Sequence, residues 1–339
     1  MYRKFFTEFG LVIYTSHKAI MPLEYVYEYR DDHVYNIYVI TCKPRTYIQT
    51  DSLAPAKESI TLNLELRNND KTTVITANDL KPIPFIDYMM LDYSLMRNDE
   101  VLRITAEEAY IRSVFDKNQV KFDNSAFRDG KFIINIESSY LLDMHYEKTQ
   151  TVQNYEVLYI GQSFGKDGKR TAQERLTNHS TLQKILTKFL CERREDSIYV
   201  FLFEVNVLNQ MSMDGFNQDS TADKVAEDKH FHNVFDHAHD FNQIVNIFEA
   251  ALINHFKPEF NIKLIDNFPN FESKGYQDYF SLDYNSLVAE LDLEFDSGPI
   301  IRLITENAEM DWINRFIKYK LFNDPNRKDM MDIFKKAEE

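Results

Sequence analysis

Side chains able to bind anions and move protons follow one another in the middle third of this 339-residue chain. The run Tyr159-Ile160-Gly161 comes first, Arg175 follows, and His179 stands four residues after Arg175. A spacing of four places two side chains on one face of a helix. Glu249 and Asn261 come later, twelve residues apart. Hydrolysis of a phosphodiester needs a positioned water, a base for its proton, and donors or positive charge around the transition state, and these residue types can supply them.

Glu249 is the most informative of these residues because of its neighbours. At helical spacing it lies between Val245 and Leu252 and beside Phe256, on the edge of an apolar arc. A carboxylate in that position is costly unless it is paired or bound to a cation. Glu249 is therefore expected to hold a divalent ion, and the alternative is a salt bridge or a side chain that reaches solvent from the helix flank.

Arg175 and a loop before it are the expected contacts to phosphate. The guanidinium of Arg175 can donate two hydrogen bonds to one phosphate, and His179 would hydrogen-bond the attacking water or the base. Lys166, Lys169 and Arg170 lie in a glycine-punctuated loop that we expect to contact backbone phosphates just before a helix begins. This loop lacks the spacing of a P-loop. The alternative for Arg175 and His179 is an ordinary place on a helix surface.

A second group of possible metal ligands lies between positions 230 and 240. If the segment is helical, three of its side chains fall at i, i+4 and i+7, which is acceptable metal geometry. The other interpretation is a polar loop that leads into a helix capped by Asp240. The members of this group are His230, His232, Asp236, His237 and His239.

Composition and charge limit the class of protein. The formal net charge is −15, which argues against a surface that clamps nucleic acid everywhere, yet residues 157–194 carry eight basic against three acidic residues. The chain has two cysteines and no apolar run near the ~20 residues that a spanning helix needs, so we expect a soluble cytoplasmic protein. The basic window inside an acidic chain predicts one focused anion site.

The elements that must position these residues can be read from hydrophobic patterns. Residues 132–144, 156–161 and 197–207 read as three strands of one small sheet. One helix is expected to begin near Ala172 and to bury Leu176, Leu182, Ile185, Leu186 and Phe189. A second helix follows the cap at Asp240 and stops before Pro258.

The flanking regions complete an α+β protein. Residues 1–130 read as a β-rich domain of unknown role, with strands near 25–42 and 59–66 and helices near 85–96 and 105–115. Residues 131–265 form the domain with the chemistry, interrupted by an insert near 209–239. Residues 266–339 read as an acidic α+β extension, with a hairpin around Gly298-Pro299 and a helix over 311–322.

The order Tyr-Ile-Gly, Arg-x-x-x-His, Glu and Pro-x-x-Asn resembles the GIY-YIG nuclease superfamily over about 130 residues. The resemblance implies a metal-dependent endonuclease, with Mg²⁺ or Mn²⁺ as cofactor, nucleic acid and most of all DNA as partner, and Tyr159 as general base. Where the family has Gly-Ile-Tyr, this chain best offers Ser138-Ser139-Tyr140, nineteen residues before Tyr159, with Tyr146 as the competitor. Two alternatives stay open, a non-catalytic interaction module on the same fold and a metallohydrolase built on the histidine group.

Overall fold

The computed structural model describes residues 1–68, 71–163, 175–176, 180–213 and 220–332. The strands are β1 (Thr7–Pro22), β2 (Ile37–Ile48), β3 (Ala54–Pro55), β4 (Ile60–Asn68), β5 (Lys71–Leu80), β6 (Asp92–Met96), β7 (Val101–Glu107), β8 (Phe127–Arg128), β9 (Lys131–Glu137), β10 (Val152–Gln162), β11 (Asp196–Met213), β12 (Ser286–Glu290), β13 (Ile300–Ile304), β14 (Glu309–Asp311) and β15 (Phe316–Lys320). The helices are α1 (Glu108–Asn118), α2 (Ser138–Thr149), α4 (Ser180–Glu192), α5 (Lys224–Phe235), α6 (Phe241–Phe256) and α7 (Gln277–Ser281).

A large curled sheet organises the described part of the chain, with the order β14-β13-β10-β2-β11-β1-β12-β15 and a branch of β3, β4 and β5 that joins the end of β2. Strand β2 lies at the centre and is buried along most of its length, as expected for a nearly continuous apolar run. It pairs antiparallel with both β10 and β11. The predicted mixed α+β class is confirmed, but the expected small three-stranded sheet is wrong, because β2 separates β10 from β11.

The expected division of the chain at 130 and at 265 does not match the strand pairing. Strands β1 and β2 come from the first expected domain and β12 to β15 from the last, yet all of them belong to the sheet that contains β10 and β11. Tyr2 also pairs with Arg327, so the two ends of the described chain lie together. The middle segment therefore has no separate sheet of its own.

Two helices cover opposite faces of this sheet. Helix α6 packs its buried residues on one face, in a core with Val39, Val157 and Phe201. Helix α4 packs on the other face, in a core with Tyr38, Leu158 and Val200. The predicted helix after Asp240 is confirmed, and the Asp240 carboxylate caps it by accepting a 2.9 Å hydrogen bond from the Asn242 amide. The predicted start near Ala172 lies outside the described residues, and Leu186 is exposed rather than buried.

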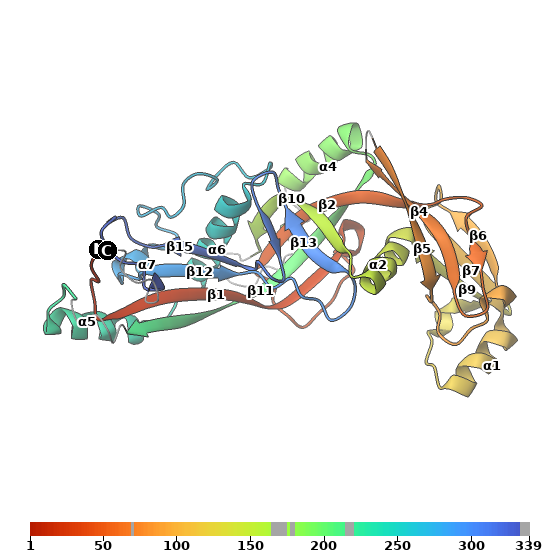
Figure 1. The fold of residues 1–339 in the computed structure, drawn as a ribbon, viewed down its shortest axis with the longest axis horizontal. Coiled ribbons are helices and arrows are strands. Elements are labelled where there is room, and N and C mark those ends of the chain that lie inside the picture. The colour runs from red at the N-terminus through yellow and green to blue at the C-terminus, as the bar shows by residue number, and fades with distance from the viewer. Residues whose placement is uncertain (69–70, 164–174, 177–179, 214–219, 333–339) are drawn as a thin grey trace.

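Between β2 and β10 the chain builds a second sheet at one end of the long molecule (Figure 1). Strands β6, β7, β9 and β8 form it, and α1 and α2 pack on it around a separate core. The strand predicted over 132–144 is confirmed up to Glu137, where β9 ends, and is wrong beyond that point, because α2 begins at Ser138. The helix predicted over 85–96 is also wrong, since 92–96 is β6, whereas the strand near 59–66 is confirmed as β4.

The C-terminal region is less helical than its sequence suggests. The hairpin expected around Gly298-Pro299 is wrong, since β12 pairs in parallel with β1 whereas β13 pairs in parallel with β10. The helix expected over 311–322 is wrong as well, because 316–320 is the strand β15. Within the described residues no helix is long and apolar enough to cross a membrane.

Candidate active site

The candidate site forms where β2 pairs with β10. In this antiparallel pair Gly161 lies opposite Tyr38, Ile160 opposite Val39, and Tyr159 opposite Ile40. Because side chains alternate between the faces of a strand, Tyr159 and Gly161 share a face, and Tyr38 lies across from Gly161 on that face. The rings of Tyr38 and Tyr159 have centroids 6.1 Å apart and planes inclined by 33°. Two phenols thus stand side by side on adjacent strands.

Gly161 makes room for the first of these phenols. A Cβ atom at position 161 would lie 2.5 Å from the Tyr38 oxygen and 2.7 Å from Cε1 of Tyr159. Real Cβ atoms essentially never approach other atoms so closely, so any side chain here would displace one of the two rings. The glycine that closes Tyr159-Ile160-Gly161 is therefore needed for the contact between Tyr38 and β10.

Tyr38 is fully buried and Tyr159 is partly buried. Burial raises the pKa of Tyr159, the charge of Glu249 raises it further, and Arg175 together with a hydrogen bond from Tyr38 lowers it in part. For Tyr38, burial again raises the pKa most, Tyr159 and Glu249 add to the effect, and Arg175 opposes it. Both phenols are consequently protonated in the free protein at neutral pH.

Glu249 projects from α6 and meets the end of β10. Its carboxylate accepts a 3.0 Å hydrogen bond from the Gln162 side chain, whose amide also donates to Asn246 over 2.9 Å. Burial raises the pKa of Glu249 to about 7, while the hydrogen bonds from Gln162 and the charge of Arg175 pull it down. The surrounding helix residues are buried and Glu249 is partly exposed, so it lies at the edge of an apolar arc, as the sequence predicts.

Arg175, one of two described helical residues before α4, completes the group. It is exposed, and its positive charge lowers the pKa values of Tyr38, Tyr159 and Glu249. It also hydrogen-bonds Tyr38. An exposed guanidinium that hydrogen-bonds one phenol can still donate to an anion that arrives from solvent.

Asn261 fastens the segment after α6 to the same strand. Its side-chain oxygen accepts from the Ile160 amide and its side-chain nitrogen donates to the Ile160 carbonyl, both over 2.9 Å. The Phe260 amide donates to the Leu158 carbonyl at the bulge where the β2 register shifts. Because β13 pairs with β10 only up to Glu156, Asn261 takes the place of a neighbouring strand beyond that point. It acts as a positioning residue.

The other expected site residues are not brought here. Tyr140 lies exposed on α2 and lines a cavity with Tyr155, Tyr199 and Phe295, a cavity that Tyr159, Arg175 and Glu249 do not line. Its competitor Tyr146 packs against the core of the second sheet. Both choices for the first tyrosine place it on a helix, whereas the tyrosine that meets Tyr159 is Tyr38. His179, Lys166, Lys169 and Arg170 lie outside the described residues.

The histidine group between 230 and 240 does not gather around a common point. His230 is buried and stacks on Phe5 with ring centroids 3.8 Å apart, His237 faces Asp278, and His239 contacts Asn209. Helix α5 ends at Phe235, so the expected helical spacing of 232, 236 and 239 is broken. Among the described residues these side chains form no set of three that could hold a metal. The described geometry of this group therefore gives the metallohydrolase alternative no support.

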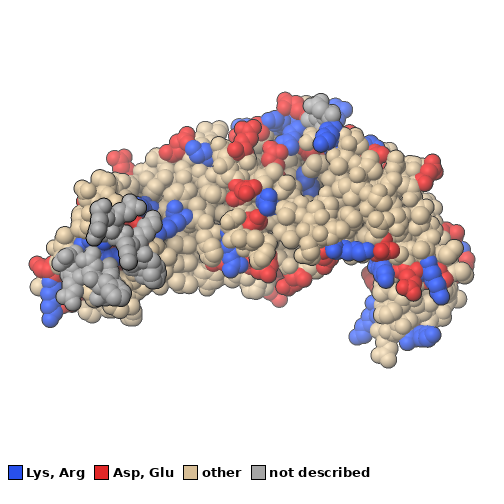
Figure 2. Space-filling model, in the orientation of Figure 1, with Lys and Arg blue, Asp and Glu red and all other residues tan. Residues whose placement is uncertain are grey.

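Charge over the visible face of the molecule is mixed. Figure 2 shows Lys and Arg interspersed with Asp and Glu rather than one sign covering the surface. Two described basic residues of the predicted window take part in ion pairs, Arg193 with Glu156 and Lys188 with Glu259. The window therefore offers less free positive charge than its sequence count suggests. Comparison of the chain with known protein families, with curated proteins and with solved structures finds no match.

Proposed function

We propose that this protein is a metal-dependent endonuclease that hydrolyses phosphodiester bonds of nucleic acid, with DNA as the first substrate to test. One observation carries the proposal. Four side chains lie within electrostatic reach of one another at the end of a strand pair, although they come from β2, β10, α6 and the described residues before α4: Tyr38, Tyr159, Glu249 and Arg175. Such a group of donors, cation and carboxylate is what phosphodiester hydrolysis requires.

The proposed relationship to GIY-YIG nucleases gains support from the first tyrosine. The residues Asn36-Ile37-Tyr38 differ from the expected Gly-Ile-Tyr only at their first position, and they pair antiparallel with Tyr159-Ile160-Gly161. In this proposal the two half-motifs are adjacent strands, and the 103 residues from 49 to 151 are an insertion between them. Tyr38 thus replaces Tyr140 as the first tyrosine of the proposed site.

Glu249 fits a divalent cation. A carboxylate whose burial raises its pKa to about 7 is poorly solvated as an anion, and a bound cation would stabilise its ionised form. Mg²⁺ is commonly held by one or two carboxylates together with substrate phosphates and water, so a single carboxylate beside an anion site is sufficient. When bound, Mg²⁺ or Mn²⁺ would stabilise negative charge on the phosphate oxygens.

The remaining residues have distinct proposed roles. Arg175 binds the scissile phosphate, because it is exposed and its guanidinium can donate to two oxygens at once. Tyr38 and Tyr159 are protonated in the free protein and can donate hydrogen bonds to a substrate, and Tyr159 can serve as a base only after added positive charge lowers its pKa and it loses its proton. Gln162 holds the Glu249 carboxylate in place and Asn261 holds β10.

The decisive experiment is a cleavage assay on duplex, single-stranded and branched DNA and on RNA, with Mg²⁺, with Mn²⁺ and with a chelator. Glu249→Gln and Arg175→Ala should each reduce metal-dependent cleavage at least ~100-fold, the loss expected when a charge stabiliser is removed. Glu272→Gln changes an exposed carboxylate in the same way and should cleave like the unmodified protein. We place the reaction in the cytoplasm.

Two results would overturn the proposal. If a Glu249→Gln variant folds normally and cuts within a few-fold of the unmodified protein, the assignment of this site is refuted. If the protein binds nucleic acid but cleaves no substrate with any metal, it is instead a non-catalytic interaction module.

A further inference from the structure

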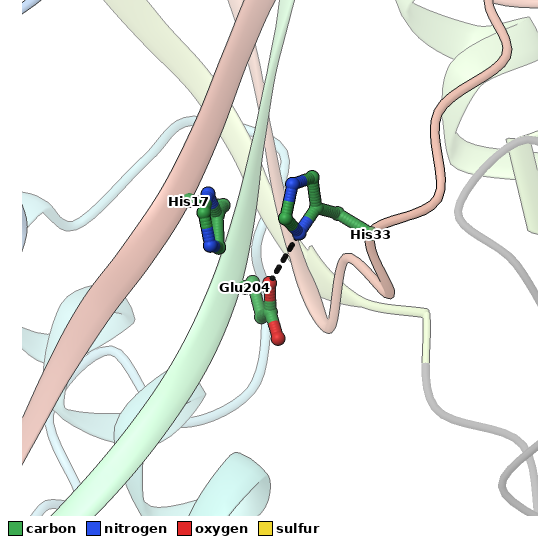
Figure 3. Close-up of side chains that lie close together, drawn as sticks. All are labelled: His17, His33 and Glu204. Carbon is green, nitrogen blue, oxygen red and sulfur yellow. Dashed lines mark hydrogen bonds and ion pairs between the residues drawn. The ribbon is translucent and has the colours of Figure 1, made fainter.

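A second group of metal-binding side chains lies away from the candidate active site, on β1, β11 and the loop before β2. His17, His33 and Glu204 each offer one ligand atom, and these atoms all lie within 4.8 Å of one another. Figure 3 shows the two imidazoles facing each other with the Glu204 carboxylate beside them. They form the one group of three such residues among those that the structure describes.

The strand pairing explains why two of these side chains meet. His17 and Glu204 are direct cross-strand partners in the antiparallel pair of β1 and β11. The register shifts between Thr15 and His17, so one extra residue in β1 redirects the side chains at this point. Bulges commonly re-aim side chains at functional sites. This pair is thus a feature of the sheet and does not depend on a surface side chain that could turn anywhere.

The third side chain comes from the loop that leads into β2. The His33 ring stacks on the His17 ring with centroids 3.5 Å apart, and its Nδ1 lies 3.1 Å from the Glu204 carboxylate. Two ligands of a tetrahedral zinc ion lie about 3.4 Å apart, because each bond is about 2.0–2.1 Å long. The His33 and Glu204 atoms are hydrogen-bonded, a few tenths of an ångström closer than a shared ion requires, so an ion could replace the proton between them after a small shift.

The carboxylate of Asp31 lies next to His33 on the side away from Glu204, where it could orient the His33 ring. Asp31 Oδ1 lies 3.9 Å from His33 Nε2, the ring nitrogen that faces away from Glu204. The hydroxyls of Tyr29 and Tyr35 donate to Asp31 over 2.7 and 2.5 Å, and these bonds fix the carboxylate. A metal-bound histidine commonly directs its second nitrogen at a carboxylate, which sets its tautomer and strengthens the ligand.

We propose that His17, His33 and Glu204 bind a divalent transition metal, with zinc as the ion best suited to two imidazoles and one carboxylate. Imidazole favours zinc and its transition-metal neighbours over magnesium, so this site differs in preference from the carboxylate of Glu249. Both histidines are exposed, which leaves room for water or another ligand to complete the coordination. The ion would join β1, β11 and the loop that ends one residue before β2.

The test is calorimetric titration of the chelator-treated full chain with Zn²⁺. We expect one tight zinc site in the unmodified protein. In His17→Gln and in Glu204→Gln the affinity for zinc should be at least 10-fold weaker, since even residues that only hydrogen-bond a ligand change metal affinity about 10–100-fold. His232→Gln is the matched control, because His232 is an exposed histidine with Asp236 3.7 Å away. Glu249→Gln should keep the zinc site, which separates this inference from the proposed nuclease.

Nuclear magnetic resonance of the histidine rings provides a measurement that needs no variant. Zn²⁺ should shift the ring nitrogens of His17 and His33 at one equivalent and leave those of His232 unchanged. The inference is overturned if the unmodified protein binds no zinc, if His17→Gln and Glu204→Gln bind it as tightly as before, or if His232→Gln weakens it equally.

Discussion

Gly161 lies directly opposite Tyr38, and a Cβ atom added at Gly161 would stand 2.5 Å from the Tyr38 phenol oxygen. Gly161→Ala must therefore displace the Tyr38 ring or the strand beneath it, and overpacking of this kind costs about 1–3 kcal/mol of stability. We expect chemical denaturation to show that loss and cleavage to fall with it. Gly275→Ala is the control, because its new Cβ would meet its nearest neighbours at an ordinary 3.5 Å. Equal stability of both variants would contradict the close contact.

Glu249 predicts a defined pH dependence of stability. Its pKa rises from 4.5 to about 7 on folding, so between these values the folded protein holds a proton that the unfolded chain has released. Stability is then highest at the acid end of this window and falls as the pH rises through it. Glu249→Gln does not titrate, so relative to the unmodified protein it should gain up to about 3 kcal/mol between pH 4.5 and pH 7.

Urea denaturation of both proteins at pH 5 and pH 8 in the presence of chelator measures this difference. A chelator is needed because a bound cation would favour the ionised carboxylate. A stability difference that does not change with pH would show that Glu249 is well solvated. Glu272→Gln, an exposed change of the same kind, should show no trend.

Replacement of Asn261 should lower the stability of the protein, although Asn261 is not expected to contact a substrate. Asn261→Ala leaves both the amide and the carbonyl of Ile160 without their partner, and each unsatisfied buried group costs about 1–3 kcal/mol. The unfolding midpoint should drop clearly, and cleavage should drop because β10 carries Tyr159. Asn307→Ala, at an exposed position, should leave the midpoint within the error of the measurement. A midpoint for Asn261→Ala equal to that of Asn307→Ala would show that Asn261 does not hold the strand.

The affinity for nucleic acid is predicted to depend on the salt concentration. Binding should weaken steeply as salt increases, because each neutralised phosphate releases a counterion. Reversing the charges of Lys166, Lys169 and Arg170 should lower the affinity and flatten the salt dependence. Filter binding at several salt concentrations measures both effects. Reversal of Lys71, Lys81 and Lys117, on the region between β2 and β10, should leave the salt slope unchanged, and equal effects of the two reversals would exclude the 166–170 loop as the contact surface.

Local patterns predicted the elements whose signals are local. The helix after Asp240 carries its own cap and a long apolar run, and it forms from Phe241 to Phe256 as expected. Strand β4 and the strands around Tyr159 and Phe201 were predictable from dense β-forming residues. The segment 311–322 misled because its aromatic residues suit either a helix or a strand, and only pairing with β12 decides the outcome.

The first tyrosine could not be found from neighbouring residues. Tyr38 meets Tyr159 only because β2 pairs with β10 across an insertion of 103 residues, and no local pattern reports such pairing. The tyrosine expected from the sequence was Tyr140, nineteen residues before Tyr159, and it lies on a helix. The resemblance between Asn36-Ile37-Tyr38 and Gly-Ile-Tyr was present in the sequence but lay far from the expected place.

The insertion between β2 and β10 also governs when the protein can fold as it leaves the ribosome. Strand β2 emerges early, but β10 appears only after the whole second sheet has been made, and β11 and α6 appear later still. Contacts between distant segments form slowly because a long loop must first be closed. Except at its end, which pairs with β4, the apolar central strand therefore spends much of synthesis without partners, and this nascent chain should depend strongly on chaperones.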